Sequence, residues 1–128
     1  MIDLAKVTSE GQQILEEFVR KYNLEGAMVV SADGFDLASY FANKELEPDL
    51  LAANVASIHL ASQDLSHQNQ KGDVKQIIIS TEDGEIAIQT VQMGEMTGSL
   101  VIVAPKGFKM GILVVAIKQL KEQLKAEE

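Results

Sequence analysis

Apolar residues recur at helical spacing through the first part of the chain, from Leu4 to Tyr22. Gaps of three, four and seven positions place them on one stripe of an α-helix. Asp3 is a residue type that caps helix beginnings, and Asn23 tolerates the left-handed backbone that ends many helices. Gly11 lies on the stripe, where it weakens the helix but permits a close neighbour. The pattern therefore predicts one helix between these two caps.

Five short apolar runs predict β-strands. Two pairs of runs are each separated by an Asp-Gly turn, which is typical of a β-hairpin, and the fifth run follows a turn at 94–98. The predicted strands are residues 26–31, 35–41, 74–80, 85–91 and 99–104.

Two further helices complete the pattern. One begins at Pro48, a residue suited to a first helical turn, and runs to about Leu65. The other follows the turn at 105–107. Its predicted buried stripe is Phe108, Ile112, Ala116, Leu120 and Leu124. The element order is therefore αββαβββα.

The polarity of each strand predicts its place in the sheet. The first and fifth strands are apolar on both faces, as expected of central strands covered by helices on each side. The second and third strands are more polar, which suits the two edges. Hairpin pairing then gives one five-stranded antiparallel sheet with the order 2-1-5-4-3. We expect an α/β (α+β) two-sided sandwich, formed by a single domain over residues 1–128.

The helix that begins at Pro48 is apolar on two sides. At about 100° per residue, one sector is expected to cover the sheet, and a second lies nearly opposite. The first sector holds Leu50, Leu51, Val55, Ile58, Ala61 and Leu65. The second sector holds Ala52, Ala53, Ala56 and Leu60. Alanine alone would suit a solvated face, but a leucine lies among these alanines, and residues 48–70 contain no Lys or Arg. We therefore expect the second sector to bind another protein.

The strand at 74–80 adds to this surface. Ile77, Ile78 and Ile79 are consecutive, so at least one of them points away from the core. As an edge strand, this segment is protected mainly by Lys75, and pairing with a second copy would cover it. A two-fold axis near the helix and the strand would bury both features. The predicted interface residues are Ala52, Ala53, Ala56, His59, Leu60, Gln63, Lys75, Ile77 and Ile79.

Composition narrows the classes of partner. The chain has 11 Lys and Arg against 19 Asp and Glu, for a net charge of −8, which disfavours nucleic-acid phosphates and anionic lipid. It has no cysteine, no signal-peptide pattern and no apolar run long enough to span a membrane. We expect a cytoplasmic protein with no nucleic-acid or membrane partner.

Residues that carry out chemistry are sparse. His59 and His67 have no acidic residue at the spacing of a zinc protease, and a chain without cysteine is a poor candidate for structural zinc. The loop at 105–111 opens a helix and has two lysines, but it lacks the spacing of a phosphate-binding P-loop. We therefore expect no enzyme activity, no catalytic residue, no cofactor and no metal site.

Taken together, these segments resemble the Roadblock domains of the dynein light-chain family. The resemblance extends from the first helix to Leu124. It rests on four segments, which are GAMVVSADG at 26–34, the alanine-rich helix, IAI at 86–88 and LVIVA at 100–104. The hairpin motif G-A-x-V-x-x-x-D-G becomes much more specific in combination with the order αββαβββα.

The resemblance implies a profilin-like fold, a dimer formed through the middle helix and the strand at 74–80, and a small Ras-like GTPase as partner. Prokaryotic stand-alone members include the GTPase-activating subunit of the gliding-motility switch, which supplies no catalytic arginine. This chain is consistent with that, since its only arginine is Arg20 on the first helix. We expect a non-enzymatic homodimeric regulator or scaffold of such a GTPase.

Two alternatives remain open. One is a structural light-chain or assembly subunit without effect on GTP turnover. The other is a ligand-sensing profilin-like domain, which would need a pocket with convergent polar groups between sheet and helix.

Overall fold

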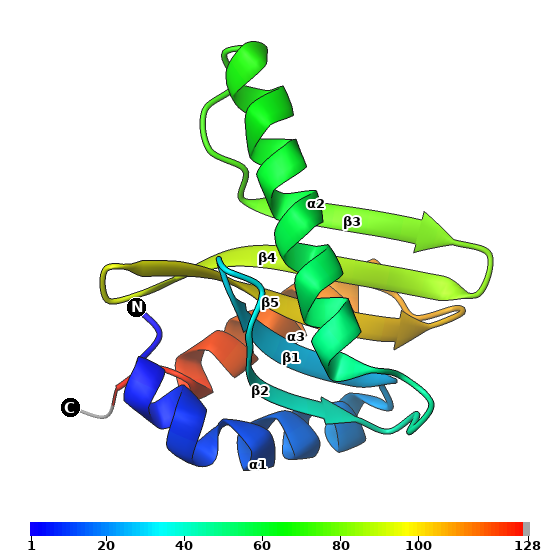
Figure 1. Ribbon diagram of the computed structural model, residues 1–128. Coiled ribbons are helices and arrows are strands. Elements are labelled where there is room, and N and C mark those ends of the chain that lie inside the picture. The colour runs from blue at the N-terminus through cyan, green and yellow to red at the C-terminus, as the bar shows by residue number, and fades with distance from the viewer. Residues whose placement is uncertain (127–128) are drawn as a thin grey trace.

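The chain folds into three helices and five strands in the predicted order, in a computed structural model that describes residues 1–126 (Figure 1). Residues 127–128 of the predicted domain lie outside that part. The helices are α1 (Leu4–Tyr22), α2 (Pro48–Gln68) and α3 (Met110–Gln123). The strands are β1 (Gly26–Ser31), β2 (Asp36–Phe41), β3 (Gln76–Thr81), β4 (Gly84–Met93) and β5 (Met96–Pro105).

The strands form one antiparallel sheet in the order β2-β1-β5-β4-β3, which confirms the predicted topology. β1 is buried along its whole length, and β5 is buried from Gly98 to Ala104. β2 and β3 lie at the two edges, where only Phe41 is buried. The runs that are apolar on both faces therefore occupy the centre, because only there does a strand have helices above and below it.

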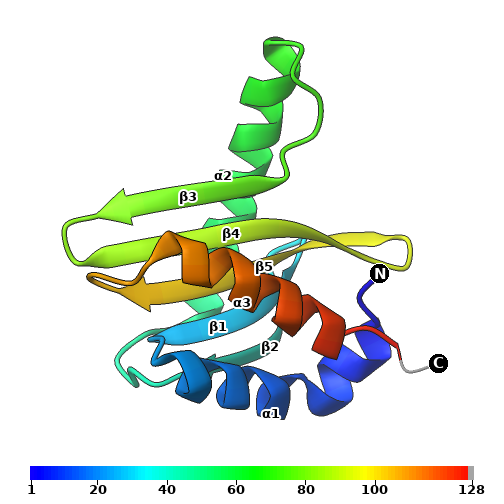
Figure 2. The same ribbon diagram turned by 180° about the vertical axis from the view of Figure 1, so that it is seen from behind.

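Helices cover both faces of this sheet. α2 lies across one face, and α1 and α3 lie on the other (Figures 1 and 2). Met28 and Val30 of β1 pack in the cluster under α2, whereas Ala27 and Val29 pack with α1 and α3. Successive residues of a strand point to opposite faces, so the sheet separates two apolar cores.

α1 has the predicted caps. The Asp3 carboxylate accepts a hydrogen bond from the Ala5 N–H at 3.2 Å, and Asn23 has a left-handed backbone with φ 54. Gly11 is buried where α1 crosses β2, and a Cβ built on it would lie 2.7 Å from the Cβ of Ala38. α1 therefore lies so close to β2 that a side chain at position 11 requires the two elements to separate.

The turn predicted at 94–98 is present but shorter than predicted. β4 and β5 each have 10 residues, and they meet in a two-residue turn at Gly94 and Glu95. Gln92 and Thr97 are paired across this hairpin, and the Thr97 hydroxyl donates to the Gln92 side chain at 3.2 Å. The hydrophobic pattern did not reveal this extension because polar residues such as Gln92 and Thr97 lie at the ends of the two strands.

The predicted buried stripe of the last helix is also partly wrong. Ile112 is 47% exposed, whereas Leu113, Ala116, Ile117 and Leu120 are buried. The helix is apolar on more than one side. The predicted residues and the buried residues both have helical spacing, so periodicity alone does not select the face that meets the sheet.

Candidate protein-interaction surface

α2 presents a different face to the sheet from the one predicted. Ala52 and Val55 are buried beneath it, at 0% and 3% exposure, with Leu51 and Ile58 packed beside them. The assignment of Ala52 to the partner-facing sector is therefore wrong, because it has no surface left for a partner. The helix is rotated by roughly a fifth of a turn relative to the prediction.

The β1–β2 turn gives the physical reason. Gly34, with φ 89, lies so close to α2 that a Cβ built on it would be 3.4 Å from the Cβ of Ala56 and 3.5 Å from the Cα of Ala53. The small residues of α2 thus let a turn of the same chain approach the helix. Ala53 remains exposed and Ala56 half-buried beside that turn.

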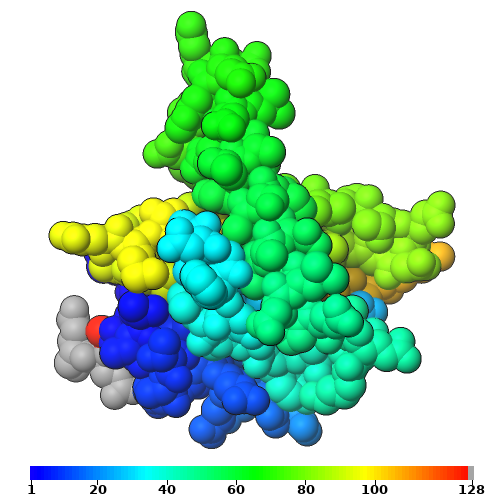
Figure 3. Space-filling view, viewed as in Figure 1, coloured from blue at the N-terminus to red at the C-terminus, as the bar shows by residue number. Residues whose placement is uncertain are grey.

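The far end of α2 has no sheet beneath it. The 21 residues of the helix span about 31 Å, whereas five strands span about 19 Å from first to last. The helix crosses the strands from β2 and extends beyond β3 (Figure 1). In the space-filling view this end rises as a column above the rest of the molecule (Figure 3). The sequence prediction missed this projection, although the length of the helix was a usable signal for it.

The projection leaves apolar side chains on the surface. Leu60 and Leu65 are 65% and 64% exposed, and Ala61 is exposed between them. The predicted sectors placed Leu65 and Ala61 against the sheet, and this is wrong because the sheet ends before it reaches them. Leu60 lies on the surface, as predicted. The only Asp or Glu residues of α2 are Asp49 and Asp64.

β3 offers an open backbone edge beside this helix. The Thr90 N–H donates to the Lys75 carbonyl at 3.0 Å, which makes these two residues a hydrogen-bonded pair. Such pairs alternate along an antiparallel ladder, so the N–H and C=O groups of Gln76, Ile78 and Ser80 point away from β4. Within residues 1–126, no strand pairs with that side of β3.

The three isoleucines of β3 divide between the faces of the sheet. Ile77 and Ile79 pack at the margin of the cluster under α2, and Ile78 packs at the margin of the cluster on the other face. All three are only half-buried, and Lys75 is exposed just before the strand. The structure thus brings Ile77, Ile79 and α2 to the same face at the open edge.

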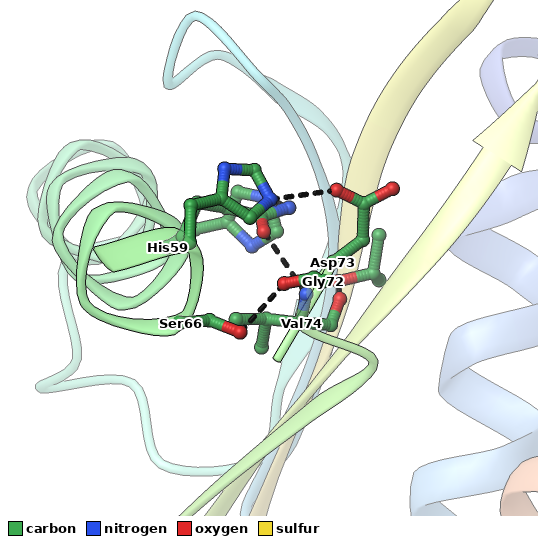
Figure 4. A network of polar contacts seen from close by, with 8 residues as sticks. His59, Ser66, Gly72, Asp73 and Val74 are labelled. Atoms are coloured by element: carbon green, nitrogen blue, oxygen red, sulfur yellow. Dashed lines mark hydrogen bonds and ion pairs between the residues drawn. The ribbon is translucent and has the colours of Figure 1, made fainter. Parts of the chain in front are cut away.

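A network of polar contacts holds the end of α2 to the beginning of β3 (Figure 4). The Ser66 hydroxyl donates to the Gly72 carbonyl at 2.6 Å, and the Val74 N–H donates to the Gln63 side-chain oxygen at 2.9 Å. The His67 Nε2 lies 2.9 Å from a carboxylate oxygen of Asp73. Gln63 is therefore a structural link between the helix and the strand, half-buried next to His59.

A hollow of about 440 Å³ lies on one flank of α2. It is lined by Ala32, Ala56, Ser57, His59, Leu60, Gln63 and Thr97. Ala32 and Thr97 come from the ends of the β1–β2 and β4–β5 hairpins, so the hollow lies beside the helix and not between helix and sheet. Four of the nine predicted interface residues, Ala56, His59, Leu60 and Gln63, line it.

The two histidines do not form a common site. His59 contacts Gln63 and His67 contacts Asp73, both within or beside α2. Among residues 1–126, no three His, Cys, Asp or Glu side chains are grouped closely enough to hold a metal ion. No helix in the same part of the chain has the length and apolar character needed to cross a membrane.

Comparison with known proteins agrees with this architecture. The model of the Roadblock/LC7 domain family matches residues 10–104. The chain is similar to MglB from Myxococcus xanthus, with 15% identity and a TM-score of 0.79 over 94% of this chain and 86% of that one. The gliding protein MglB from Thermus thermophilus has 25% identity and a TM-score of 0.71 over 88% of this chain and 83% of that one.

Profilin II of Acanthamoeba castellanii, at 14% identity, has a TM-score of 0.51 over 88% of this chain and 94% of that one, which supports the profilin-like fold. No curated protein sequence matches the chain. The family model covers most of the chain, including α2, the open edge strand and the hairpin motif at 26–34. The chain therefore belongs to the Roadblock/LC7 family.

Proposed function

We propose that this protein is a non-enzymatic homodimer formed through α2 and β3, and that the surface made by the two paired helices binds a small Ras-like GTPase. One observation carries the proposal. α2 extends beyond the open edge of β3 (Figure 1). The end of the helix therefore has no sheet beneath it at the same place where the strand has no pairing partner.

A second copy paired along β3 would complete both elements. Antiparallel pairing would give partners to the outward backbone groups of Gln76, Ile78 and Ser80 and would continue the sheet beneath the projecting end of α2. By two-fold symmetry, the partner's helix would project over β3 of the first copy. The two helices would then lie side by side above Ile77 and Ile79.

The side chains at this place favour such a contact energetically. Full burial of a Leu or Ile side chain contributes roughly 1.5–3 kcal/mol. Leu60 and Leu65 are largely exposed and Ile77 and Ile79 are half-buried, and a two-fold contact uses each of them twice. Backbone hydrogen bonds between the two β3 strands would fix the register of the dimer.

Family membership and the sparse charge of α2 support the GTPase as partner. The chain is 25% identical to a protein that is itself named a gliding protein, and the family resemblance implies small Ras-like GTPases. A surface with few carboxylates and several exposed apolar residues is suited to a protein partner.

Any effect on GTP hydrolysis would be indirect. Arg20 lies on α1, on the opposite face of the sheet from α2, and pairs with Glu16 at 3.2 Å. The α2 surface therefore has no arginine to offer to the transferred phosphate. Stimulation would come from ordering the catalytic loops of the GTPase itself.

The dimer is tested by the double variant Leu60→Glu with Leu65→Glu. Two carboxylates placed in an apolar interface should each cost several kcal/mol, so the variant is expected to have the mass of one chain by light scattering. The matched control is Val114→Glu with Val115→Glu, which places two carboxylates at 52% and 55% exposed aliphatic positions on α3, on the opposite face of the sheet. At about 300 mM salt the control should keep the dimer mass. A dimer in both variants would place the interface elsewhere.

The GTPase is tested with a panel of purified small Ras-like GTPases. Binding of the GTP-bound form to the dimer but not to the monomeric variant, with faster single-turnover hydrolysis, would support a regulator. Binding without a change in the rate of hydrolysis would support the assembly subunit instead. No binding to any GTPase, in either nucleotide state, would contradict this part of the proposal.

A further inference from the structure

A second apolar surface lies on α3, on the face of the molecule opposite to α2. Ile112, Val114 and Val115 are 47%, 52% and 55% exposed. No element of the described chain covers this side of α3 in the view from behind (Figure 2). The buried stripe of the helix already seals the core, so these three side chains are not needed for packing within the chain.

Lysines flank these residues at both ends of the helix. Lys106 and Lys109 precede α3, and Lys118 and Lys121 follow its exposed aliphatic residues. None of the four makes an ion pair within residues 1–126. We call these lysines, with the three aliphatic residues, the α3 patch.

The one acidic residue of this region is already engaged. The Lys125 ammonium donates to the Glu122 carboxylate at 2.6 Å. This hydrogen bond and the charge of Lys125 hold the pKa of Glu122 below its ordinary value. Within the part of the chain that the structure describes, the four flanking lysines therefore remain without a neutralising partner.

Charge is distributed unevenly along the chain. Residues 105–125 contain five of the 11 basic residues but one of the 19 acidic residues, which gives them a net charge of +4. The remaining residues have a net charge of −12, for a total of −8. A basic surface on so acidic a chain is complementary to other parts of the same chain.

One acidic region also has an exposed apolar residue next to it. Glu45, Glu47 and Asp49 are exposed where the chain enters α2, and Leu50 is 58% exposed beside them. The nearest lysine, Lys44, lies over the ring of Tyr40, 4.6 Å from its centroid. We call these three carboxylates and Leu50 the acidic corner.

We propose that the α3 patch of one copy binds the acidic corner of a second copy. The leucine would contact the aliphatic residues of α3, and the carboxylates would lie among the lysines on either side. Because the two surfaces differ, the contact is heterologous, and it links copies head to tail until a ring closes or a filament forms. The acidic corner lies at the beginning of α2, away from the projecting end of the helix that the proposed dimer uses, so the contact would join dimers into larger assemblies.

The contact is expected to be weak and dependent on salt. Three aliphatic residues and four lysines form less than the roughly 800 Å² per partner of a stable interface. Exposed charges are screened over about 8–10 Å at physiological salt, so an interaction that depends on them falls as ionic strength rises. The association constant should fall at least tenfold between about 30 mM and 300 mM salt.

Sedimentation of the whole protein over a concentration series, at these two salt concentrations, tests the contact. Lys109→Glu with Lys118→Glu should abolish species larger than the basal unit at low salt, and so should Glu47→Lys with Asp49→Lys. A mixture of the two double variants should associate again, because each supplies the charge that the other lacks. Both variants keep a net negative charge, so general attraction does not explain such recovery.

The matched control for the lysine variant is Lys21→Glu with Lys71→Glu, which makes the same change of net charge at exposed lysines outside both surfaces. This control should assemble as the unmodified protein does. A protein that keeps one mass at every concentration in low salt would overturn the proposal, and so would a mixture that does not recover. Binding of the α3 patch to phosphatidylserine vesicles, in the absence of self-association, would assign it to a lipid surface and also overturn the proposal.

Discussion

The two edges of the sheet are built in different ways. β2 is covered by α1, which crosses it where Gly11 meets Ala38, and its pairing with β1 is interrupted by a register shift between Val29 and Val30. β3 has no helix alongside its outer edge within residues 1–126, and its register with β4 is regular from Gln76 to Thr81. Those six residues include no charged side chain.

Natural sheets usually block their edges, because an open strand pairs with any other open strand. In this protein one edge is blocked by a helix, by an irregularity and by cations near Tyr40, while the other edge is left regular. We therefore expect a further strand to add to the sheet at β3 and not at β2.

The largest effect is expected at the covered edge. Gly11→Leu would force α1 away from β2, because even a Cβ would lie 2.7 Å from Ala38. Such overpacking should lower the free energy of unfolding by about 3 kcal/mol in chemical denaturation. Gly111→Leu is the control, since that glycine is exposed on α3 and a Cβ there meets nothing within 4 Å. Equal losses in both variants would show that the close crossing of α1 and β2 is not the cause.

A smaller effect is expected at the open edge. Ser80→Pro removes a backbone N–H that points away from β4, so it should leave the stability of the single chain nearly unchanged. It should weaken the dimer by about 1–2 kcal/mol, or roughly tenfold in Kd, because each copy loses one hydrogen bond across the two-fold interface. Sedimentation on dilution measures this change. Ser80→Thr keeps the N–H and should keep the Kd, and an unchanged Kd in the proline variant would exclude pairing through β3.

The smallest effect is expected from the contact between the Lys44 ammonium and Tyr40 of β2. Lys44→Ala removes an ammonium 4.6 Å from the centroid of Tyr40, which should lower the free energy of unfolding by about 0.5 kcal/mol. Lys71→Ala, at an exposed lysine on the α2–β3 connection, is the matched control. Chemical denaturation compares the two, and identical values would show that the contact with Tyr40 adds nothing measurable.

Most of the fold could be predicted from the sequence. The polarity of a strand indicates whether helices cover one or both faces of the sheet at that strand. β1 and β5 each contain a run of apolar residues facing both sides of the sheet, which placed them at the centre, and hairpin pairing then fixed the order of the remaining strands. The caps at Asp3 and Asn23 could be predicted because each has a local backbone role.

The faces of α2 and α3 could be predicted only in part. Both helices have apolar residues around most of their circumference. The spacing of apolar residues is therefore compatible with more than one buried face. The close approach of Gly34 to Ala53 and Ala56 selects the buried side of α2, and that contact joins segments distant in the sequence. Ala52 was assigned to the wrong side because that contact could not be foreseen, and Leu65 because the sheet ends before it reaches the end of α2. Leu60 was assigned to the surface correctly.

The contacts between the end of α2 and residues 72–74 have a consequence for the kinetics of assembly. They join the projecting helix and the edge strand into one preorganised unit within each chain. The conformational entropy of ordering this connection is lost when the chain folds, not when two chains meet. Dimer formation would then approach rigid-body docking, with little structural rearrangement and an association rate limited mainly by orientation.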